Sequence, residues 1–247
     1  WVSGQSKFFA HGQYGQISQS TDAVTWTMCA GNPIFSSTST LSWDTTAHQN
    51  YTYLSGPGVF ILGGIGAAQG IIVMGNNSNG FAQKQALVTS SMSTTQRGFA
   101  YLSGANRYVT FATSTNRVAW STDSVTWTNG TSTNVPTTPY SITAGGSYYV
   151  IGGASGTMAY STDGATWTSA TSNNSGSIYG LAYSATPTNK FVAVGNTGQI
   201  SSSTNGITWT LQLNAGGTYP FHDVIYAGGK YVAIGYNGTQ GVVATST

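Results

Sequence analysis

Charge is scarce in this sequence of 247 residues: Asp, Glu, Lys and Arg together make up 5% of it, and Glu is absent. Ordinary soluble domains carry about 25% charged residues. The seven basic residues give a net charge of +2 and form no patch, so we expect no nucleic-acid partner. The single cysteine, Cys29, excludes an internal disulfide. No stretch approaches about 18 consecutive apolar residues, so we expect no membrane span.

The shortage of carboxylates also limits catalysis. Most glycosidases need two carboxyl groups that flank the scissile bond. Three of the five aspartates, Asp22, Asp123 and Asp163, belong to a repeated turn, and Asp44 and Asp223 are far apart in the sequence. The three histidines lack the spacing of metal ligands, and no Ser is singled out as a nucleophile. We therefore predict no catalytic residues, no metal site and no cofactor, and a protein that is not an enzyme.

What the sequence does contain is one octapeptide written four times, at 20–27, 121–128, 161–168 and 203–210; the third copy reads Ser-Thr-Asp-Gly-Ala-Thr-Trp-Thr. An Asp or Asn side chain can imitate a turn by accepting hydrogen bonds from backbone N–H groups, which we expect one and two residues further on. Gly164 and Gly206 follow with a cheap positive φ, whereas Ala23 and Ser124 hold that position at some cost. The Thr-Trp-Thr that ends the octapeptide favours a strand. The predicted structural residues are Asp22, Trp26, Asp123, Trp127, Asp163, Trp167, Asn205 and Trp209.

A second repeat predicts the fold. Six segments read as one aromatic-led strand: 7–12, 59–64, 107–112, 148–153, 190–195 and 230–235. Their leading aromatic residues are 52, 48, 41, 42 and 40 residues apart. One unit resolves into strands at 178–183, 190–195, 199–203 and 207–211, with Ile207, Trp209 and Leu211 on one face. A period of about 40 residues with four short strands is typical of a β-propeller. We predict an all-β propeller of about six four-stranded blades, forming a single domain over 1–247 with almost no helix.

Two stretches and both ends depart from this repeat. The stretches near 30–51 and 76–98 are rich in Ser, Thr, Asn and Gln and are predicted to be irregular insertions. Seven residues precede Phe8 and 16 follow Tyr231, fewer than a full blade of about 40 requires. We expect incomplete blades at the ends, either because the sequence is a segment of a longer chain or because something else completes the last blade. We adopt the prediction that the sequence is a segment of a longer chain.

The octapeptide resembles the Asp-box, or BNR, repeat Ser-x-Asp-x-Gly-x-Thr-Trp of sialidase-like and sortilin-like β-propellers. The match is strong at 161–168 and good at 20–27 and 121–128, Asn205 replaces the Asp in the last copy, and the unit at 59–98 has no copy. This resemblance covers nearly the whole chain, but it implies a fold and not an activity. The Ser/Thr/Gly-rich, charge-poor composition is similar to that of propeller segments in bacteriophage tail fibres and decoration proteins.

These features predict a non-catalytic structural or adhesion module at an extracellular or virion surface. Its expected partners are other copies or structural proteins of the same particle and a host-surface glycan. Trp43 lies in the first insertion, where it either packs beneath the loop or exposes its ring for stacking on a ligand. Trp43, Asp44 and His48 are the candidate ligand-binding residues. The alternative function is a free secreted lectin. Two alternatives remain. One is a sialidase-like glycosidase, which would need a catalytic acid from chain beyond these ends. The other is a scaffold resembling the photosystem assembly propellers.

Overall fold

The computed structural model describes residues 8–11, 17–28, 51–54, 59–66, 69–76, 80–87, 96–112, 116–131, 133–216 and 219–246. This part of the chain is almost entirely β-structure, as the sequence predicts. Its one helical element is a short 3₁₀ turn, Ala154–Gly156. Within the same residues, no helix has the length and apolar character needed to cross a membrane.

The strands form six antiparallel sheets, in each of which the strands pair in sequence order. The first sheet contains β1 (Phe8–His11), β2 (Ile17–Ser20) and β3 (Thr27–Met28), and the second β4 (Tyr51–Leu54), β5 (Val59–Gly66), β6 (Gln69–Asn76) and β7 (Gly80–Leu87). The third contains β8 (Gln96–Leu102), β9 (Arg107–Ala112), β10 (Val118–Ser121) and β11 (Thr128–Asn129), and the fourth β12 (Pro139–Gly145), β13 (Tyr148–Gly153), β14 (Met158–Ser161) and β15 (Thr168–Ser169). The fifth contains β16 (Ile178–Ser184), β17 (Lys190–Gly195), β18 (Gln199–Ser203) and β19 (Thr210–Asn214), and the sixth β20 (Phe221–Ala227), β21 (Lys230–Tyr236) and β22 (Gly241–Thr245).

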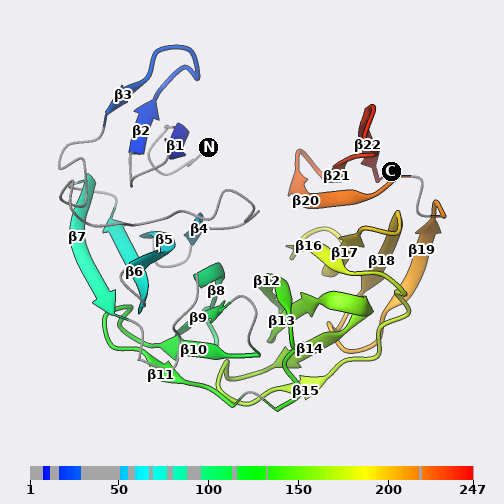
Figure 1. Cartoon of the computed structure of the whole chain (residues 1–247), viewed down its shortest axis with the longest axis horizontal. Helices are drawn as coiled ribbons and strands as arrows, with labels where there is room; N and C mark the ends of the chain where they lie inside the picture. Colours follow the sequence, from blue (N-terminus) through cyan, green and yellow to red (C-terminus); the bar gives the residue numbers. More distant parts are fainter. Residues whose placement is uncertain are drawn as a thin grey trace.

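The sheets stand side by side around a common centre, with β4, β8, β12, β16 and β20 innermost and β7, β11, β15 and β19 on the rim (Figure 1). The first and sixth sheets face each other across an opening in the ring (Figure 1). This is the arrangement of a β-propeller, which confirms the all-β, propeller part of the predicted fold class. The prediction of four strands in every blade holds for the four middle sheets, whereas the first and sixth show three strands each among the described residues.

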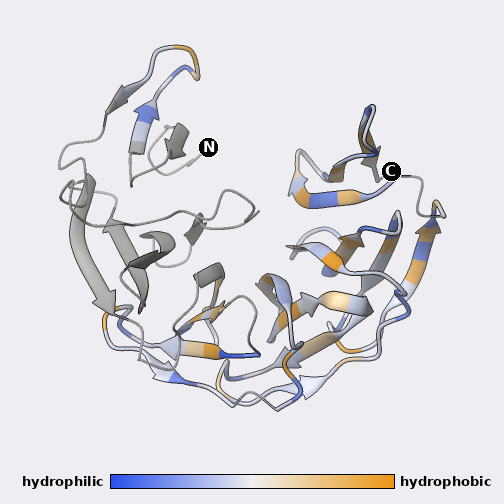
Figure 2. Ribbon diagram, viewed as in Figure 1, coloured by the Kyte–Doolittle hydropathy of each residue, from blue (hydrophilic) through white to orange (hydrophobic). Residues whose placement is uncertain are grey.

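The core lies between the sheets, which explains the apolar sequence of the aromatic-led strands. On β17, Phe191 and Ala193 pack toward the fourth sheet, and Val192 and Val194 pack toward the sixth. Because both faces of this strand are covered, its sequence is continuously apolar rather than alternating. The rim strand β19, Thr-Leu-Gln-Leu-Asn, alternates between apolar and polar residues instead, as the coloured bands along it show (Figure 2).

The predicted start of the last strand in the fifth sheet is wrong. The strand predicted at 207–211 begins only at Thr210, because the side chain of Asn205 accepts hydrogen bonds from the N–H groups of Ile207 and Thr208 and holds both in the turn. Ile207, Trp209 and Leu211 therefore do not share an apolar face: Trp209 is fully buried, whereas Leu211 is 36% exposed.

The stretch 76–98, predicted to be irregular, contains the regular strand β7. Its sequence, Gly-Phe-Ala-Gln-Lys-Gln-Ala-Leu, lacks a regular alternation of apolar and polar residues, and its backbone pairs with β6. The other predicted insertion, 30–51, lies almost wholly outside the described residues.

Candidate functional site

Each octapeptide folds into a turn that is built around one side-chain oxygen. In the copy at 121–128, Oδ1 of Asp123 accepts hydrogen bonds from the N–H groups of Val125 at 2.8 Å and Thr126 at 2.7 Å. The N–H of Ser124 donates instead to Oγ of Ser121, and that hydroxyl donates to Oδ1 of Asp123. The Asp thus binds the N–H groups two and three residues on, rather than one and two as predicted. The other three copies bind in the same way through Asp22, Asp163 and Asn205.

These hydrogen bonds set the charge state of the turns. The N–H groups of Thr25 and Val24 lower the pKa of Asp22 to about 2, and those of Thr126 and Val125 lower the pKa of Asp123 to about 2. Burial opposes ionisation of Asp163, but its hydrogen bonds outweigh this effect, and its pKa is also lowered. These three aspartates are therefore ionised at neutral pH, and each is committed to holding a turn.

The positive φ that the sequence predicts after the Asp or Asn is present in every copy. The angle is 62° at Ala23, 64° at Ser124, 71° at Gly164 and 70° at Gly206. Non-glycine residues are strained in this left-handed region. The first two turns therefore carry backbone strain that the last two avoid.

The octapeptide tryptophans differ in how far they are buried between sheets. Trp127, Trp167 and Trp209 are 5%, 4% and 0% exposed, whereas Trp26 in the first sheet is 41% exposed. Trp209 packs among side chains of the fourth sheet and of its own fifth sheet. Its carbonyl also accepts a hydrogen bond from the Nδ2 of Asn173, which lies in the connection from the preceding sheet. The four copies thus have one local structure but two different environments.

A row of aromatic rings crosses the inner strands of three sheets. The pairing register shifts by one residue between Pro139 and Ser141, between Ile178 and Gly180, and between Phe221 and Asp223. The residues at these shifts are Tyr140, Tyr179 and His222. The ring of Tyr140 meets that of Tyr179 edge-on, with centroids 5.1 Å apart, and the ring of Tyr179 stacks on that of His222, with centroids 5.7 Å and planes 6° apart. A register shift re-aims a side chain, and here it repeats at the same position of the fourth, fifth and sixth sheets.

This inner row is half-buried and carries one neighbouring carboxylate, Asp223. Oδ1 of Asp223 accepts a hydrogen bond at 2.8 Å from the N–H of Val224. The rings of such a surface can stack on the C–H faces of a neutral ligand, and its polar atoms can form hydrogen bonds with the hydroxyl groups of the ligand. Tyr140 and Tyr179 were not predicted, since each reads as an ordinary strand residue. Their identical position in successive repeats, next to His222 in the third, is the signal that identifies them.

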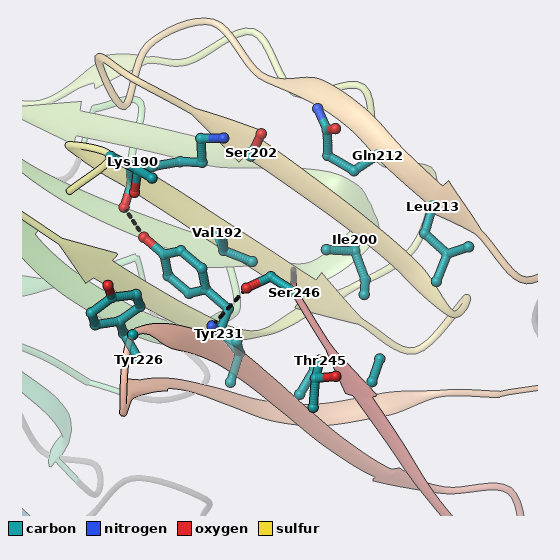
Figure 3. A pocket seen from close by; sticks show the side chains of 15 residues that line it. Lys190, Val192, Ile200, Ser202, Gln212, Leu213, Tyr226, Tyr231, Thr245 and Ser246 are labelled. Atoms are coloured by element: carbon teal, nitrogen blue, oxygen red, sulfur yellow. Dashed lines mark hydrogen bonds between the residues drawn. The ribbon is translucent and has the colours of Figure 1, made fainter. Parts of the chain in front are cut away.

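A cavity of about 450 Å³ lies between the fifth and sixth sheets, near the rim (Figure 3). Its walls include Lys190, Val192 and Ile200 on one side and Tyr231 and Ala233 on the other. The hydroxyl of Tyr231 donates to the carbonyl of Lys190 and ties the two sheets together beside the cavity (Figure 3). Burial raises the pKa of Tyr231.

The predicted ligand-binding site falls outside the part of the chain that the structure describes. Trp43, Asp44 and His48 lie outside the described residues, so their role in ligand binding stays a prediction. Among the side chains that the structure places, no three from His, Cys, Asp and Glu come together in a way that could hold a metal ion.

The chain is similar to solved structures in its fold. No family model matches the chain, and no curated protein matches it. The solved virginiamycin B lyase of Staphylococcus aureus is similar with a TM-score of 0.74 at 13% identity, over 100% of this chain and 82% of that one. YCF48 from Cyanidioschyzon merolae is similar with a TM-score of 0.60 at 13% identity, over 95% and 77% of the two chains. The GH74 enzyme of Niastella koreensis has a TM-score of 0.54 at 19% identity, over 92% of this chain and 41% of that one. Such identities show a shared β-propeller fold.

The prediction that the protein is not an enzyme is overturned by these similarities, because two of the three relatives in fold are enzymes. The prediction rested on the shortage of carboxylates for glycoside hydrolysis, on the spacing of the histidines and on the lack of a Ser that stands out as a nucleophile. A propeller is a scaffold on which unrelated chemistries occur, so a shortage of carboxylates excludes one reaction type and not catalysis in general.

Proposed function

We propose that the chain is an Asp-box propeller of the kind found in bacteriophage structural proteins. On this proposal it acts at an extracellular or virion surface as a structural or adhesion module that contacts a host glycan. The observation that carries glycan contact is the inner row of Tyr140, Tyr179 and His222, which presents aromatic rings at one repeated position. Its partners in the particle are other copies or neighbouring structural proteins.

The chemistry of the row and of the chain favours a neutral sugar over a charged ligand. Aromatic rings stack on the C–H faces of sugars, and hydroxyl and amide groups hydrogen-bond their hydroxyls. With a net charge of +2 and 5% charged residues, the chain has no field that would attract a polyanion. Binding to a neutral glycan is expected to depend little on salt, since screening acts only on charges.

A free secreted lectin is the second candidate. Lectins of this architecture repeat their sugar contacts from blade to blade, and the equivalent positions of Tyr140, Tyr179 and His222 are such a repetition. The two proposals share glycan binding and differ in whether the protein belongs to a larger particle.

An array of neutral and sialylated oligosaccharides tests glycan binding. We expect neutral glycans to bind, and Tyr179→Ala to weaken binding by about tenfold or more, as loss of a central aromatic contact does. The matched control is Tyr236→Ala, which removes a tyrosine that is 54% exposed on the sixth sheet and should leave binding unchanged. Thermal melts of both variants report whether they fold. Absence of binding to every glycan, or equal loss in both variants, would refute the role of the inner row.

Sedimentation of the native source separates the two candidates. Peptide mass spectrometry is used to follow the chain through the fractions. Recovery with a large particle supports the virion module. Recovery in the light soluble fraction refutes it and supports the free lectin.

A further inference from the structure

The dipeptide Asn-Gly occurs four times in the chain, at 79–80, 129–130, 205–206 and 237–238. It is chemically labile, because glycine has no Cβ to hinder attack of its backbone nitrogen on the side-chain carbonyl carbon of the preceding Asn. The structure describes both residues of the last three copies and gives them different surroundings. Their reactivity should therefore differ, although the dipeptide is the same.

The side chains of Asn205 and Asn237 are held in the same way. Oδ1 of each accepts hydrogen bonds at 2.8–3.0 Å from the N–H groups two and three residues further on. Each Oδ1 also accepts a hydrogen bond from one hydroxyl, that of Ser203 or that of Thr239. Such donors stabilise the negative charge that a carbonyl oxygen acquires when its carbon is attacked. They act on both copies, so the electrophile does not distinguish the two.

The two copies differ in the nitrogen that would attack. The N–H of Gly206 donates to Oγ of Ser203 at 2.9 Å, and Gly206 is buried. A Cβ on Gly206 would lie 2.8 Å from Cγ2 of Val150 on the neighbouring sheet, so this turn has little room to rearrange. Gly238 is exposed instead. Among the residues that the structure describes, its N–H has no hydrogen-bond acceptor, and a Cβ on it would meet nothing within 4 Å.

The copy at 129–130 is held in the manner of 205–206. The N–H of Gly130 donates to the carbonyl of Val118 at 3.0 Å, next to the pairing of β10 with β11. A Cβ on Gly130 would lie 2.7 Å from Cγ2 of Val118. The attacking nitrogen is thus engaged and confined in two of the three described copies.

We propose that Asn237 is a site of spontaneous covalent modification in the folded chain, whereas Asn129 and Asn205 are protected. The nitrogen of Gly238 gives its proton to the solvent and forms a bond to Cγ of Asn237, and the side-chain nitrogen of Asn237 leaves as ammonia. Water then opens the resulting succinimide at either carbonyl, which leaves an aspartate or an isoaspartate. This modification is independent of the inner row and does not rest on glycan binding.

The two products affect the hairpin between β21 and β22 differently. An aspartate keeps the acceptor oxygen of Asn237, as Asp123 shows by accepting the same pair of N–H groups in its own turn. An isoaspartate adds a methylene group to the backbone and disrupts the hydrogen bond from the N–H of Asn237 to the carbonyl of Gln240. Each product adds one negative charge to a chain whose net charge is +2.

Incubation of the folded chain at mildly alkaline pH, followed by peptide mass spectrometry, tests the proposal. Trypsin cleaves after Lys230 and so places Asn205 and Asn237 in different peptides. The chain unfolded in guanidinium chloride gives the reference rate of each dipeptide without the fold. We expect Asn237 to react in the folded chain within about threefold of its unfolded rate. Asn205 should be slowed by at least about tenfold, because its turn must first open.

Two variants separate the site from its surroundings. Asn237→Gln should abolish the modification of the peptide that follows Lys230, because Gln would have to close a larger ring. Ser203→Ala removes the acceptor of the Gly206 N–H and should speed the reaction of Asn205 by about threefold or more. Asn129, in the third sheet, is the internal control and should keep its rate. If Ser203→Ala does not fold, the comparison of Asn205 with Asn237 in the unmodified chain still decides the question.

Two results would overturn the proposal. Protection of Asn237 in the folded chain as strong as that of Asn205 would show that the hairpin also confines the attacking nitrogen. Reaction of Asn205 in the folded chain at its unfolded rate would show that the hydrogen bond to Ser203 and the burial of Gly206 give no protection.

Discussion

The four octapeptides allow one substitution to be made in two environments, which isolates the packing between sheets. Trp209 is 0% exposed and Trp26 is 41% exposed, yet each indole N–H donates to the carbonyl three residues earlier, at 3.1 Å and 3.3 Å. Trp209→Ala and Trp26→Ala therefore remove the same local hydrogen bond. They differ in the apolar contacts that are lost.

The expected magnitudes follow from burial. A tryptophan buries roughly 150–250 Å², and at about 25 cal/mol per Å² this corresponds to roughly 4–6 kcal/mol. Measured Trp→Ala changes in protein cores are about 3–5 kcal/mol, so we expect Trp209→Ala to lower the free energy of unfolding by about 4 kcal/mol. At Trp26 less surface is buried and water can enter the vacated space, so about 2 kcal/mol or less is expected.

Urea unfolding followed by far-UV circular dichroism measures both variants against the unmodified chain. The difference between them should be at least about 2 kcal/mol at an unchanged slope of free energy against urea. Equal losses would mean that the octapeptide tryptophans act only within their own turns. A loss below about 1 kcal/mol for Trp209→Ala would contradict the inter-sheet packing itself.

Two further predictions concern the turns. Ala23→Gly should raise the free energy of unfolding by about 0.5–1 kcal/mol, because it relieves the strain at a φ of 62°. The control Ala165→Gly changes a residue outside the left-handed region and should lower the free energy of unfolding. Urea unfolding measures both variants, and destabilisation by Ala23→Gly would contradict the strain. The pKa of Asp123 is lowered to about 2, so its contribution to stability is present above the ordinary value of 3.8 and is lost as the pH falls toward 2. Asp123→Asn should keep the acceptor oxygen and flatten the fall in thermal midpoint between about pH 4 and pH 2; an unchanged pH profile would rule out this titration.

Much of the fold could be predicted because the relevant signals are local. The aromatic-led strands such as β17 are apolar on both faces, and the positive φ at Ala23 and Ser124 follows from alignment with glycines in sister copies. Strand β7 was missed because its sequence lacks the alternation typical of a strand, and its pairing with β6 is a tertiary effect.

The inner row could not be predicted from strand patterning alone. Alternation along a strand assigns side chains to faces, but a register shift of one residue changes the direction of the residue at the shift. Tyr140 and Tyr179 lie at such shifts, and a shift leaves no trace in the order of apolar and polar residues. The cavity escaped prediction for a related reason, since it depends on which residues of two sheets face each other.

Burial at the opening of the ring also depends on which sheets face each other, and this cannot be read from strand patterning. Val194 on β17 and Ile234 on β21 occupy equivalent positions of the repeat, and both strands read as aromatic-led and apolar. Val194 is 0% exposed because the sixth sheet covers it, whereas Ile234 is 52% exposed on the far face of that sheet. Equivalent apolar residues thus differ in exposure according to whether one of the described sheets covers them. In a propeller, the repeat specifies which residues are apolar, and the pairing of sheets decides which of them are buried.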